Sequence, residues 1–258
     1  MKLRARLAMV AGSVPKNAVV ADIGTDHAFL PIALIENKIA KKVIACDIGE
    51  GPLSVARANV QKSGLSGIEL RLSDGLREIS PNEADVVTIA GMGGDLIVRI
   101  LESAPWLKTY QTRLILQPMS SADSLRSFLA KNGFSVLSEQ AVRDTGRLYT
   151  VITAQFDGRV SELSPGRQYI GALDEDNSPA ARDYICWQLD VLREKADSLC
   201  RVQRMNEEYI KTKAAVLEIE KLLGEGSDCE FGEGSDCKFD EDTGCECGEG
   251  SSYDRGGN

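Results

Sequence analysis

The sequence predicts a doubly wound α/β domain, in which helices cover both faces of a mostly parallel sheet. Short runs rich in β-branched residues alternate with segments of helical pattern through the first half of the chain. Most of these runs are nearly continuously apolar, as is typical of strands that are buried on both faces. Two later runs are separated only by "RDTGR", a link that permits a hairpin but is too short for a parallel crossover.

The first five expected strands are each followed by polar or glycine-bearing residues. Strands are expected at residues 18–24, 42–48, 68–74, 84–91, 113–118, 134–142 and 148–156. Helices are expected between them at residues 29–40, 52–64 and 94–105. Pro31 and Pro52 fit the first turns of two of these helices, and Gly64 fits a C-terminal stop.

Composition divides the chain into a neutral body and an acidic tail. Residues 225–258 hold eleven acidic side chains against Lys238 and Arg255, so the whole net charge of −9 lies there. This tail repeats the pattern "GEGSDCEF" and has few aliphatic residues, so we expect residues 224–258 to be disordered. Four of the seven cysteines lie in it, but their spacing matches no common zinc pattern, and we expect no metal site.

The sequence also bears on where the protein works. No apolar run approaches the roughly 20 residues of a membrane span. The basic amino terminus lacks the continuous apolar segment and the small-residue cleavage site of a secretory signal. We therefore expect a cytoplasmic protein without a membrane partner.

Polar and glycine residues stand at the carboxyl ends of successive expected strands, where open α/β sheets bind ligands. Gly24 follows the first strand, and Asp47 closes the second, where an acid can accept hydrogen bonds from both ribose hydroxyls. Asp74 ends the third and is placed to bind an adenine amino group, and "AGMGG" at residues 90–94 ends the fourth. Each feature alone is more often a turn or a helix cap, but four at successive strand ends favour a ligand site.

The stretch "ADIGTDHAFLP" departs from the pattern of a dinucleotide-binding turn. Where further glycines would stand, it has Thr25, Asp26 and His27, the only histidine of the chain. One interpretation is structural: Thr25 or Asp26 caps the helix that begins near His27, whose ring is then a wall residue. The other interpretation is that the acid and the imidazole face a ligand.

Five motifs, in this order, resemble the bacterial tRNA (adenine-22-N1)-methyltransferase family of class I S-adenosylmethionine-dependent enzymes. They are "ADIGTDHAFLPIAL", "GPLSVARANV", "SDGL", "IAGMGG" and "LILQP", and the match runs to about residue 157. A parallel sheet that ends in an antiparallel hairpin is also the architecture of such methyltransferases. The resemblance implies a Rossmann-like, seven-stranded methyltransferase sheet, S-adenosylmethionine as cofactor, tRNA as partner, and methylation of N1 of an adenine, adenine 22 in the family.

The resemblance places candidate residues in three roles. Asp26 and His27 are expected to be catalytic, since methyl transfer to N1 needs alignment and tolerance of a cationic product rather than a covalent nucleophile. The cofactor is expected to be bound by Asp22, Gly24, Thr25, Asp47, Ile48, Asp74, Gly75, Ala90, Gly91, Met92 and Gly93. The substrate is expected to contact Arg4, Arg6, Phe29 and Gln117, with Phe29 stacking on a flipped base.

The chain departs from the family pattern at three of its motif positions. Phe29 stands where the family often has Tyr, and Asp47 stands where it commonly has Glu. Both replacements can keep their expected roles, in stacking and in ribose binding. Met119 stands where the family motif "QPN" has Asn, so an amide that can bond the target base is replaced by a thioether.

Residues 178–223 have the apolar spacing of a helical coiled coil. The apolar stripe consists of Ile185, Leu189, Leu192, Ala196 and Leu199, followed by Val202, Met205, Tyr209, Thr212, Val216, Ile219 and Leu223. Its phase slips between Leu199 and Val202, which predicts two antiparallel helices, although no Gly or Pro excludes one long helix. We therefore expect three parts: a methyltransferase domain at 1–160, a coiled-coil domain at 161–223, and the tail.

A tRNA partner requires a positive surface, because phosphate contacts supply most of the sequence-independent affinity. Lys2, Arg4 and Arg6 form a basic cluster at the amino terminus that no acid balances. Acids alternate with the cations of the predicted coil, a pattern that is also typical of a solvated helix. The coil cations are Arg193, Lys195, Arg201, Arg204, Lys211 and Lys213.

Two other functions remain open on the sequence. One is a methyltransferase that acts on protein or on a small molecule, since the absence of an "NPPY"-type motif argues only against the familiar exocyclic-amine enzymes. The other is a non-catalytic module that binds S-adenosylmethionine or RNA. For the oligomeric state, we expect a monomer.

Overall fold

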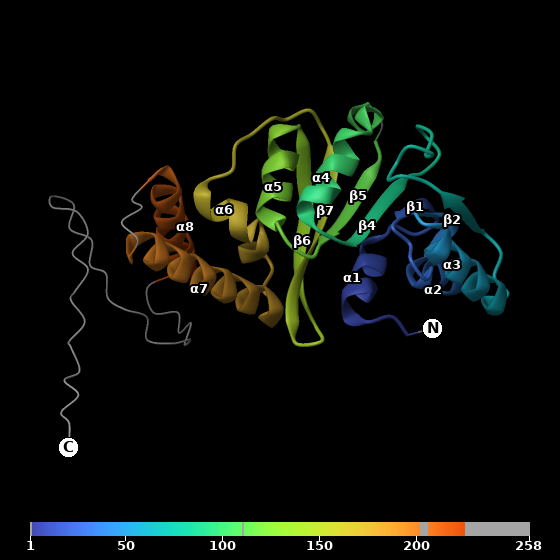
Figure 1. Cartoon of the computed structure of the whole chain (residues 1–258), viewed down its shortest axis with the longest axis horizontal. Coiled ribbons are helices and arrows are strands. Elements are labelled where there is room, and N and C mark those ends of the chain that lie inside the picture. The colour runs from blue at the N-terminus through green and yellow to red at the C-terminus, as the bar shows by residue number, and fades with distance from the viewer. Residues whose placement is uncertain (1, 110, 202–205, 225–258) are drawn as a thin grey trace, which may run out of the picture. The chain divides into compact units, whose positions relative to one another are not determined.

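A seven-stranded sheet runs through the first part of the chain, in the strand order β3-β2-β1-β4-β5-β7-β6 (Figure 1). The strands are β1 (Ala18–Ile23), β2 (Ala40–Asp47), β3 (Ile68–Leu72), β4 (Val86–Met92), β5 (Arg113–Pro118), β6 (Phe134–Asp144) and β7 (Arg147–Phe156). The first five pair in parallel, and β7 pairs antiparallel with both β5 and β6. The predicted strands and the predicted terminal hairpin are confirmed.

The computed structural model describes residues 2–109, 111–201 and 206–224. By its internal contacts the chain divides into two units, Met1–Ile185 and Cys186–Asn258. The domain boundary expected at residue 160 stays a prediction, and the acidic repeats after residue 224 lie outside the described residues. In the part of the chain that is described, no helix is long and apolar enough to cross a membrane.

Helices of the first unit cover both faces of the sheet, as the apolar strands predict. They are α1 (Ala5–Ser13), α2 (Phe29–Glu36), α3 (Glu50–Ser63), α4 (Gly94–Glu102), α5 (Ala122–Lys131) and α6 (Pro165–Ile170), with short 3-10 turns η1 (Pro105–Lys108) and η2 (Leu173–Glu175). Pro31 and Pro52 lie in the first turns of α2 and α3. Gly64 ends α3 in the left-handed conformation, with φ of 66°, which confirms the predicted stop.

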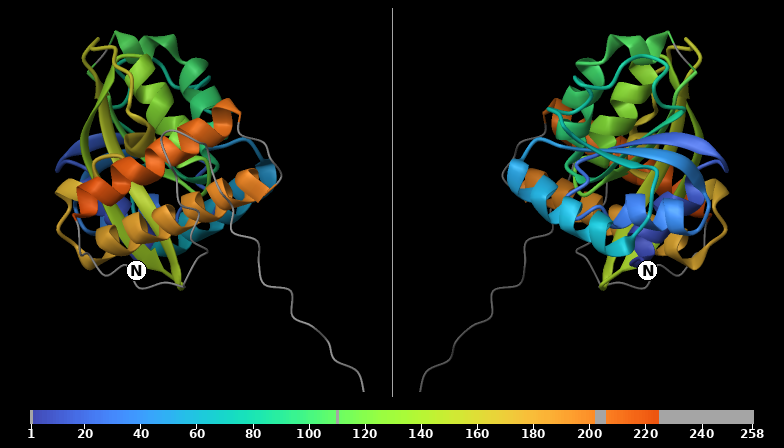
Figure 2. Two further views of the ribbon diagram at one scale, coloured as in Figure 1. Left: turned by 90° about the vertical axis from the view of Figure 1, so that its left-hand side faces the viewer. Right: turned by 90° about the vertical axis from the view of Figure 1, so that its right-hand side faces the viewer.

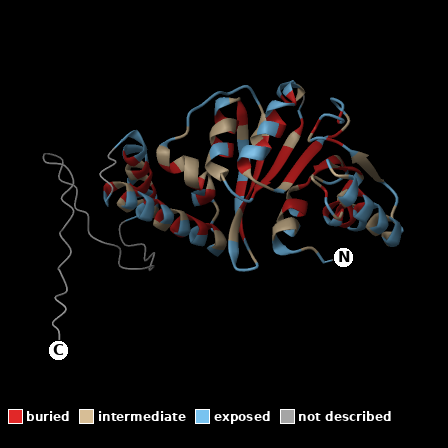
Figure 3. Cartoon of the chain, in the orientation of Figure 1, coloured by how far each residue is buried: buried red, intermediate tan, exposed pale blue. Residues whose placement is uncertain are grey.

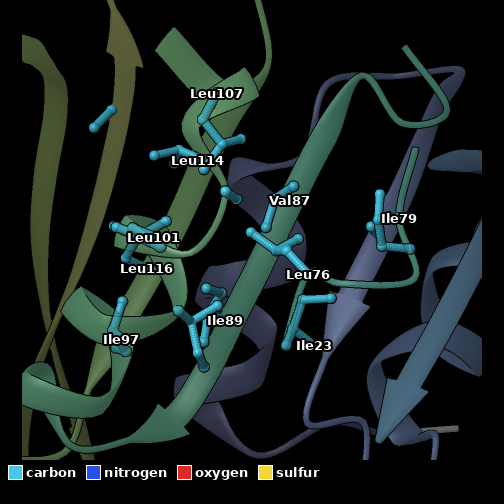
Figure 4. Close-up of a cluster of buried hydrophobic side chains, with 14 of the residues drawn as sticks. Ile23, Leu76, Ile79, Val87, Ile89, Ile97, Leu101, Leu107, Leu114 and Leu116 are labelled. Carbon is cyan, nitrogen blue, oxygen red and sulfur yellow. The ribbon is translucent and has the colours of Figure 1, made fainter. Parts of the chain in front are cut away.

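Two buried clusters hold the helices to the sheet, and the side chains of each strand alternate between them. On one face, α4 and α5 pack over strand residues that include Ile23, Ile89 and Leu116 (Figure 4). On the other face, α1 and α2 pack over Val20 and Val86, among others. Buried residues are accordingly concentrated in the strands and on the inner sides of the helices (Figure 3).

The second unit contains a helical pair. Helix α7 (Pro179–Arg201) enters it from the first unit, and α8 (Glu207–Leu223) folds back along α7 (Figure 2). The predicted stripe is buried at Leu189, Leu192, Ala196, Tyr209, Thr212, Val216 and Ile219. An ion pair of 2.7 Å between Arg193 and Glu220 joins the two helices. Two helices rather than one long helix are therefore present. The turn was expected near the phase slip between Leu199 and Val202; α7 continues to Arg201, and residues 202–205 lie outside the described residues.

A buried ion pair ties the segment after the sheet to the sheet itself. The guanidinium of Arg126 on α5 lies 2.7 Å from the carboxylate of Glu139 on β6, and both side chains are almost wholly buried. Arg126 also donates to the carbonyls of Gln168 and Tyr169 at the end of α6. Because removing one partner of a buried pair leaves an uncompensated charge, this cluster is a sensitive point of the fold.

Gly171→Ala is expected to disrupt this cluster. A Cβ at Gly171 would lie 1.8 Å from Oε2 of Glu139 and 2.6 Å from Nε of Arg126, and its φ is +59°. We expect the free energy of unfolding in urea to fall by roughly 3 kcal/mol or more. Gly146→Ala is the matched control, since its φ is +80° but no atom lies within 4 Å of its Cβ position. It should lose only the backbone cost of about 1 to 2 kcal/mol, and equal losses in both variants would contradict the role of the ion pair.

Candidate active site

The candidate site lies where the strand order reverses, between β1 and β4. β1 pairs with β2 on one side and with β4 on the other, all in parallel, so the loops that follow them meet at one edge of the sheet. Open α/β sheets bind ligands at such a switch point. The motif residues that the sequence singled out follow these strands.

Gly24 brings the loop after β1 close to Met92 at the end of β4. Its φ is +75°, and its N–H and that of Thr25 both donate to the carbonyl of Cys46 at 2.8 Å. A Cβ at Gly24 would lie 2.2 Å from the terminal methyl of Met92. A larger residue would displace the flexible end of the Met92 side chain, and the positive φ of this position favours glycine.

Asp47 organises the neighbouring loops and still faces solvent. Its Oδ1 accepts a hydrogen bond from the N–H of Gly49 at 3.0 Å, and its Oδ2 accepts one from the N–H of Asp26 at 3.1 Å. A carboxylate has about four acceptor positions, so further donors can be bound. Ile48 next to it is an apolar side chain that is 70% exposed.

Asp26, His27 and Phe29 form a continuous polar and aromatic surface. The carboxylate of Asp26 lies 3.5 Å from Nε2 of His27, and the side chains are 66% and 44% exposed. The rings of His27 and Phe29 have centroids 5.3 Å apart, and Phe29 is itself exposed. Nδ1 of His27 is buried and has no hydrogen-bond partner among the described residues.

The structure does not support the helix-cap interpretation of this stretch. Helix α2 begins at Phe29, its N-cap residue is Ala28, and no side chain caps it. Asp26 and Ala28 both have positive φ, 50° and 57°, in a region that residues with a Cβ rarely adopt. Such strain costs of order 1–3 kcal/mol per residue and is found where the surrounding structure enforces it, often at functional sites. Here Asn59 helps to enforce it, since its side-chain amide donates to the carbonyl of His27 at 2.9 Å.

Asp22 is buried beneath the site and links two strands of the sheet. Its side chain is buried, and the hydroxyl of Thr88 on β4 donates to its Oδ1 at 2.7 Å. Burial raises the pKa of Asp22 above its ordinary value, and the hydrogen bond from Thr88 opposes this rise. Asp22 is therefore an internal link between the two central strands.

The remaining expected cofactor residues lie around the same edge. Asp74 is exposed and forms an ion pair of 3.1 Å with Arg77, while the preceding Ser73 donates its N–H to the carbonyl of Asp47 at 2.9 Å. The glycines provide tight turns: φ is +60° at Gly75 and +83° at Gly91, and Gly93 precedes α4. Ala90 lies in β4, opposite Gln117 of β5.

The four residues that were expected to contact the substrate differ in how far they are exposed. Phe29 is at the surface beside His27, and Arg4 is an exposed residue at the start of α1. Arg6 is partly buried and donates to the side-chain oxygen of Gln117. Gln117 itself is fully buried. Sequence reasoning missed Tyr149, whose ring centroid lies 5.8 Å from the guanidinium carbon of Arg6, because no local pattern links a hairpin residue to the amino terminus.

The site holds neither a reactive thiol nor a metal cluster in the described ranges. Cys46 precedes Asp47, but burial raises the pKa of its thiol to about 12, which keeps it protonated at neutral pH. Among residues 2–109, 111–201 and 206–224, no three His, Cys, Asp or Glu side chains gather closely enough to hold a metal ion. The chemistry available is that of a carboxylate, an imidazole and an aromatic ring.

The chain is similar in sequence to methyltransferases. Residues 3–152 match the family model of a methyltransferase domain. A tRNA (adenine(22)-N(1))-methyltransferase of Bacillus subtilis (strain 168) is 44% identical over 160 residues, which cover 62% of this chain and 67% of that protein. The chain belongs to the tRNA (adenine-22-N1)-methyltransferase family.

Solved structures agree with this family membership. The crystal structure of the B. subtilis m1A22 tRNA methyltransferase TrmK has a TM-score of 0.74 at 35% identity, over 86% of this chain and 97% of that one. A Streptococcus pneumoniae protein in complex with S-adenosyl-L-methionine has a TM-score of 0.68 at 33% identity, over 84% and 98% of the two chains. The coverage includes the helical pair as well as the sheet unit, since the sheet unit alone is shorter than the matched share.

The residues at the switch point of this methyltransferase fit S-adenosylmethionine. The free acceptor positions of Asp47 suit ribose hydroxyls, and exposed Ile48 offers an apolar surface to an adenine ring. Gly24 and Gly91 have positive φ, and a Cβ at either position would crowd the side chain of Met92 or of Arg6. This assignment of individual residues to the cofactor stays a prediction.

Asp47→Ala tests the cofactor assignment in this methyltransferase. Hydrogen bonds to a charged group contribute about 1.5 to 3 kcal/mol, so S-adenosylmethionine should bind roughly tenfold more weakly or worse by calorimetry. Glu50→Ala is the control, because Glu50 is an exposed acid in the first turn of α3. If a folded Asp47→Ala protein binds with wild-type affinity, Asp47 is not the ribose acceptor.

Asp22→Asn tests the buried acid. Because the pKa of Asp22 is higher in the folded than in the unfolded chain, the folded state binds more protons, and wild-type stability falls as pH rises from 3.8, the ordinary value, through the folded-state pKa. The stability of Asp22→Asn relative to wild type should therefore increase with pH, by about 1.4 kcal/mol per unit of pKa shift. Urea unfolding of both proteins from acidic to neutral pH measures this, and a pH-independent difference would contradict it.

Proposed function

We propose that this chain transfers a methyl group from S-adenosylmethionine to N1 of an adenine in tRNA, adenine 22. The proposal rests on one contact above all: the N–H of Asp26 donates to Asp47 at 3.1 Å. This hydrogen bond sets the Asp26–Phe29 surface directly beside the acid expected to bind the ribose. The B. subtilis relative, a tRNA (adenine(22)-N(1))-methyltransferase, supports the choice of substrate.

The bound cofactor supplies an electrophilic methyl group on a sulfonium. Adenine N1 has an in-plane lone pair, so the protein mainly has to align the base and tolerate the cation that forms. The exposed carboxylate of Asp26 can stabilise that cation or accept a hydrogen bond from the exocyclic amine. His27 can hold the edge of the base with Nε2, since its side chain is 44% exposed and Nδ1 is buried. Phe29 offers an exposed ring for stacking on an extruded base.

Two groups of basic residues were predicted to contact tRNA, one at the amino terminus and one on the coil. The charges of the described residues favour the amino-terminal group. Lys2 and Arg4 are exposed there. Three of the six coil cations are paired with acids of the two helices: Arg193 with Glu220, Lys195 with Glu208 and Lys211 with Glu207. Arg204 lies outside the described residues. We infer that the amino-terminal cluster contributes more phosphate attraction than the coil does.

Mass spectrometry of nucleosides tests the reaction directly. Unmodified tRNA incubated with the purified full chain and S-adenosylmethionine should gain one N1-methyladenosine. Digestion into oligonucleotides should place it at position 22. Methylation of protein alone, or cofactor binding without any methylated nucleoside, would contradict the proposed function.

Asp26→Asn and His27→Ala separate substrate chemistry from cofactor binding. Asn tolerates a left-handed conformation about as well as Asp, so Asp26→Asn removes the charge and keeps the strained backbone at φ of 50°. Both variants should bind S-adenosylmethionine as wild type does, while kcat for tRNA methylation falls roughly tenfold or more. Glu102→Gln, at the far end of α4, is the control for loss of an exposed acid. Wild-type turnover in both variants would leave this stretch without a catalytic role.

A further inference from the structure

The hairpin of β6 and β7 extends beyond the sheet that it closes. The ladder between β5 and β7 ends at the pair of Leu116 and Ile152; from there β5 continues only to Pro118, whereas β7 runs back to Arg147. At a rise of about 3.4 Å per residue, the hairpin therefore projects roughly 10 Å past the end of β5. Because β5 is parallel to β4, it projects at the edge where the cofactor loops meet, beside α1 (Figure 1). The proposed reaction gives this projection no role.

The turn that closes the hairpin is tight and regular. Asp144 and Arg147 are register partners, so only Thr145 and Gly146 lie between the two strands. Both have positive φ, 48° and 80°, as in a type I′ turn, whose twist matches that of the flanking strands. We call residues 143–147 the hairpin tip. Its backbone continues the ladder of β6 and β7 without a loop of irregular structure.

The hairpin tip is anchored to two other elements of the same unit. The Oδ2 atom of Asp144 accepts a hydrogen bond from the backbone N–H of Arg6 on α1, at 3.4 Å. The guanidinium of Arg143 lies 2.7 Å from the carboxylate of Asp183, in the first part of α7. The tip is therefore held at a fixed distance from the loops of the site, although it lies outside them.

Arg147 gives the hairpin tip an open positive charge. Its side chain is exposed, and within the described ranges no carboxylate lies within 4.0 Å of its guanidinium, whereas Arg143 has one. The two acids close to the tip are already engaged, Asp144 by the N–H of Arg6 and Asp183 by Arg143. Arg4 is exposed and stands only two residues before Arg6, so a second cation lies near the same anchor.

These charges match a polyanion better than they match a protein surface. Between its two arginines the tip carries Asp144, Thr145 and Gly146, so it lacks the apolar residues that form the centre of a protein interface. A guanidinium has five N–H donors in a planar fork, which suits the oxygens of a phosphate. Small side chains at the turn let a nucleic-acid backbone approach closely.

We propose that the hairpin tip binds a backbone phosphate of the tRNA through Arg147, outside the site that holds the reacting base. Phosphate contacts fix the register and orientation of a nucleic acid and do not read its sequence. A cation held on a rigid hairpin roughly 10 Å beyond the end of β5 thereby sets how the strand around the target adenine is presented to the site. The proposal rests on the proposed function for the identity of the RNA.

Arg147→Gln removes the charge of the tip, and Arg159→Gln is the matched control. Arg159 has a side chain that is 87% exposed, and it follows β7 at the opposite edge of the sheet. Fluorescence anisotropy with labelled, unmodified tRNA measures affinity across a salt series. We expect Arg147→Gln to bind tRNA roughly three- to tenfold more weakly at low salt, because one solvated charge-assisted contact is lost. Its salt slope should fall by about one, whereas Arg159→Gln should keep the wild-type slope.

Thr145→Asp and Thr145→Asn form a second matched pair. Asp and Asn before Gly146 both suit the positive φ of a type I′ turn, so the two variants differ in one charge and not in the backbone that they favour. A carboxylate at the tip repels phosphate. The Asp variant should therefore bind tRNA several-fold more weakly than the Asn variant, with the difference shrinking as salt screens it. Calorimetry should find the same S-adenosylmethionine affinity in all four variants.

Equal tRNA affinities within both matched pairs would overturn the proposal. So would a loss of S-adenosylmethionine affinity in folded Arg147→Gln, since the hairpin would then act on the cofactor site instead of on the RNA. The binding measurements need no methyl transfer, and the methylation assay of the wild-type chain needs no hairpin variant. Failure of the proposed function and failure of this inference are therefore observed separately.

Discussion

The hydrogen bond between Asp22 and Thr88 joins the two central strands, β1 and β4, that carry the site. The two residues are direct register partners on β1 and β4, where the strand order of the sheet reverses. Gly24 directly follows β1 and Gly91 lies near the end of β4, so the bond helps to fix these two backbone positions relative to each other. Burying a carboxyl group is costly unless its hydrogen bonds are made, and its raised pKa records that cost. An acid at this position is explained by the loops that it holds together.

Around these two strands, side chains of the site accept hydrogen bonds from backbone N–H groups. Asp47 accepts from Gly49 and Asp26, and Gln117 accepts from Gly91. Backbone donors are fixed by the fold, so a side chain that accepts from them is itself held in one orientation. The acceptors are a half-exposed carboxylate on one loop and a buried amide behind another. The half-exposed carboxylate of Asp47 retains acceptor positions beyond these two bonds, whereas the amide of Gln117 also accepts from Arg6.

The sequence predicted the sheet well because its signals are local and repeated. Apolar runs marked all seven strands, and the five-residue link "RDTGR" required the hairpin of β6 and β7. The heptad spacing with a phase slip predicted two helices, α7 and α8, and the buried residues follow the predicted stripe. Helix α1 was not among the expected elements. It is short and basic at its start, and what fixes it is packing against the sheet through Val10 and Ala11, which no local pattern reveals.

The site could be predicted in part, because some of its residues are marked by local sequence signals. Residues at strand ends, such as Gly24 and Asp47, meet because parallel strands bring their carboxyl ends to one edge. Contacts between distant segments were beyond reach: Arg6 and Gln117 are 111 residues apart, and Tyr149 belongs to the hairpin. Nor does a sequence show that Gln117 is wholly buried, although a glutamine at the end of an apolar strand is a weak signal of a buried amide.

Asp26 and Arg6 share one feature: within the described residues, neither side chain forms an ion pair with a carboxylate, a Lys or an Arg. Asp26 has no Lys or Arg within 4.0 Å among the described residues, and its near neighbour is the imidazole of His27. Arg6 is held by an amide and an aromatic ring in place of a carboxylate. An internal ion pair would have stabilised each side chain more simply, at the loss of its attraction for a ligand. The positive φ of Asp26 and Ala28 costs free energy, so the surrounding structure must enforce the shape of this loop.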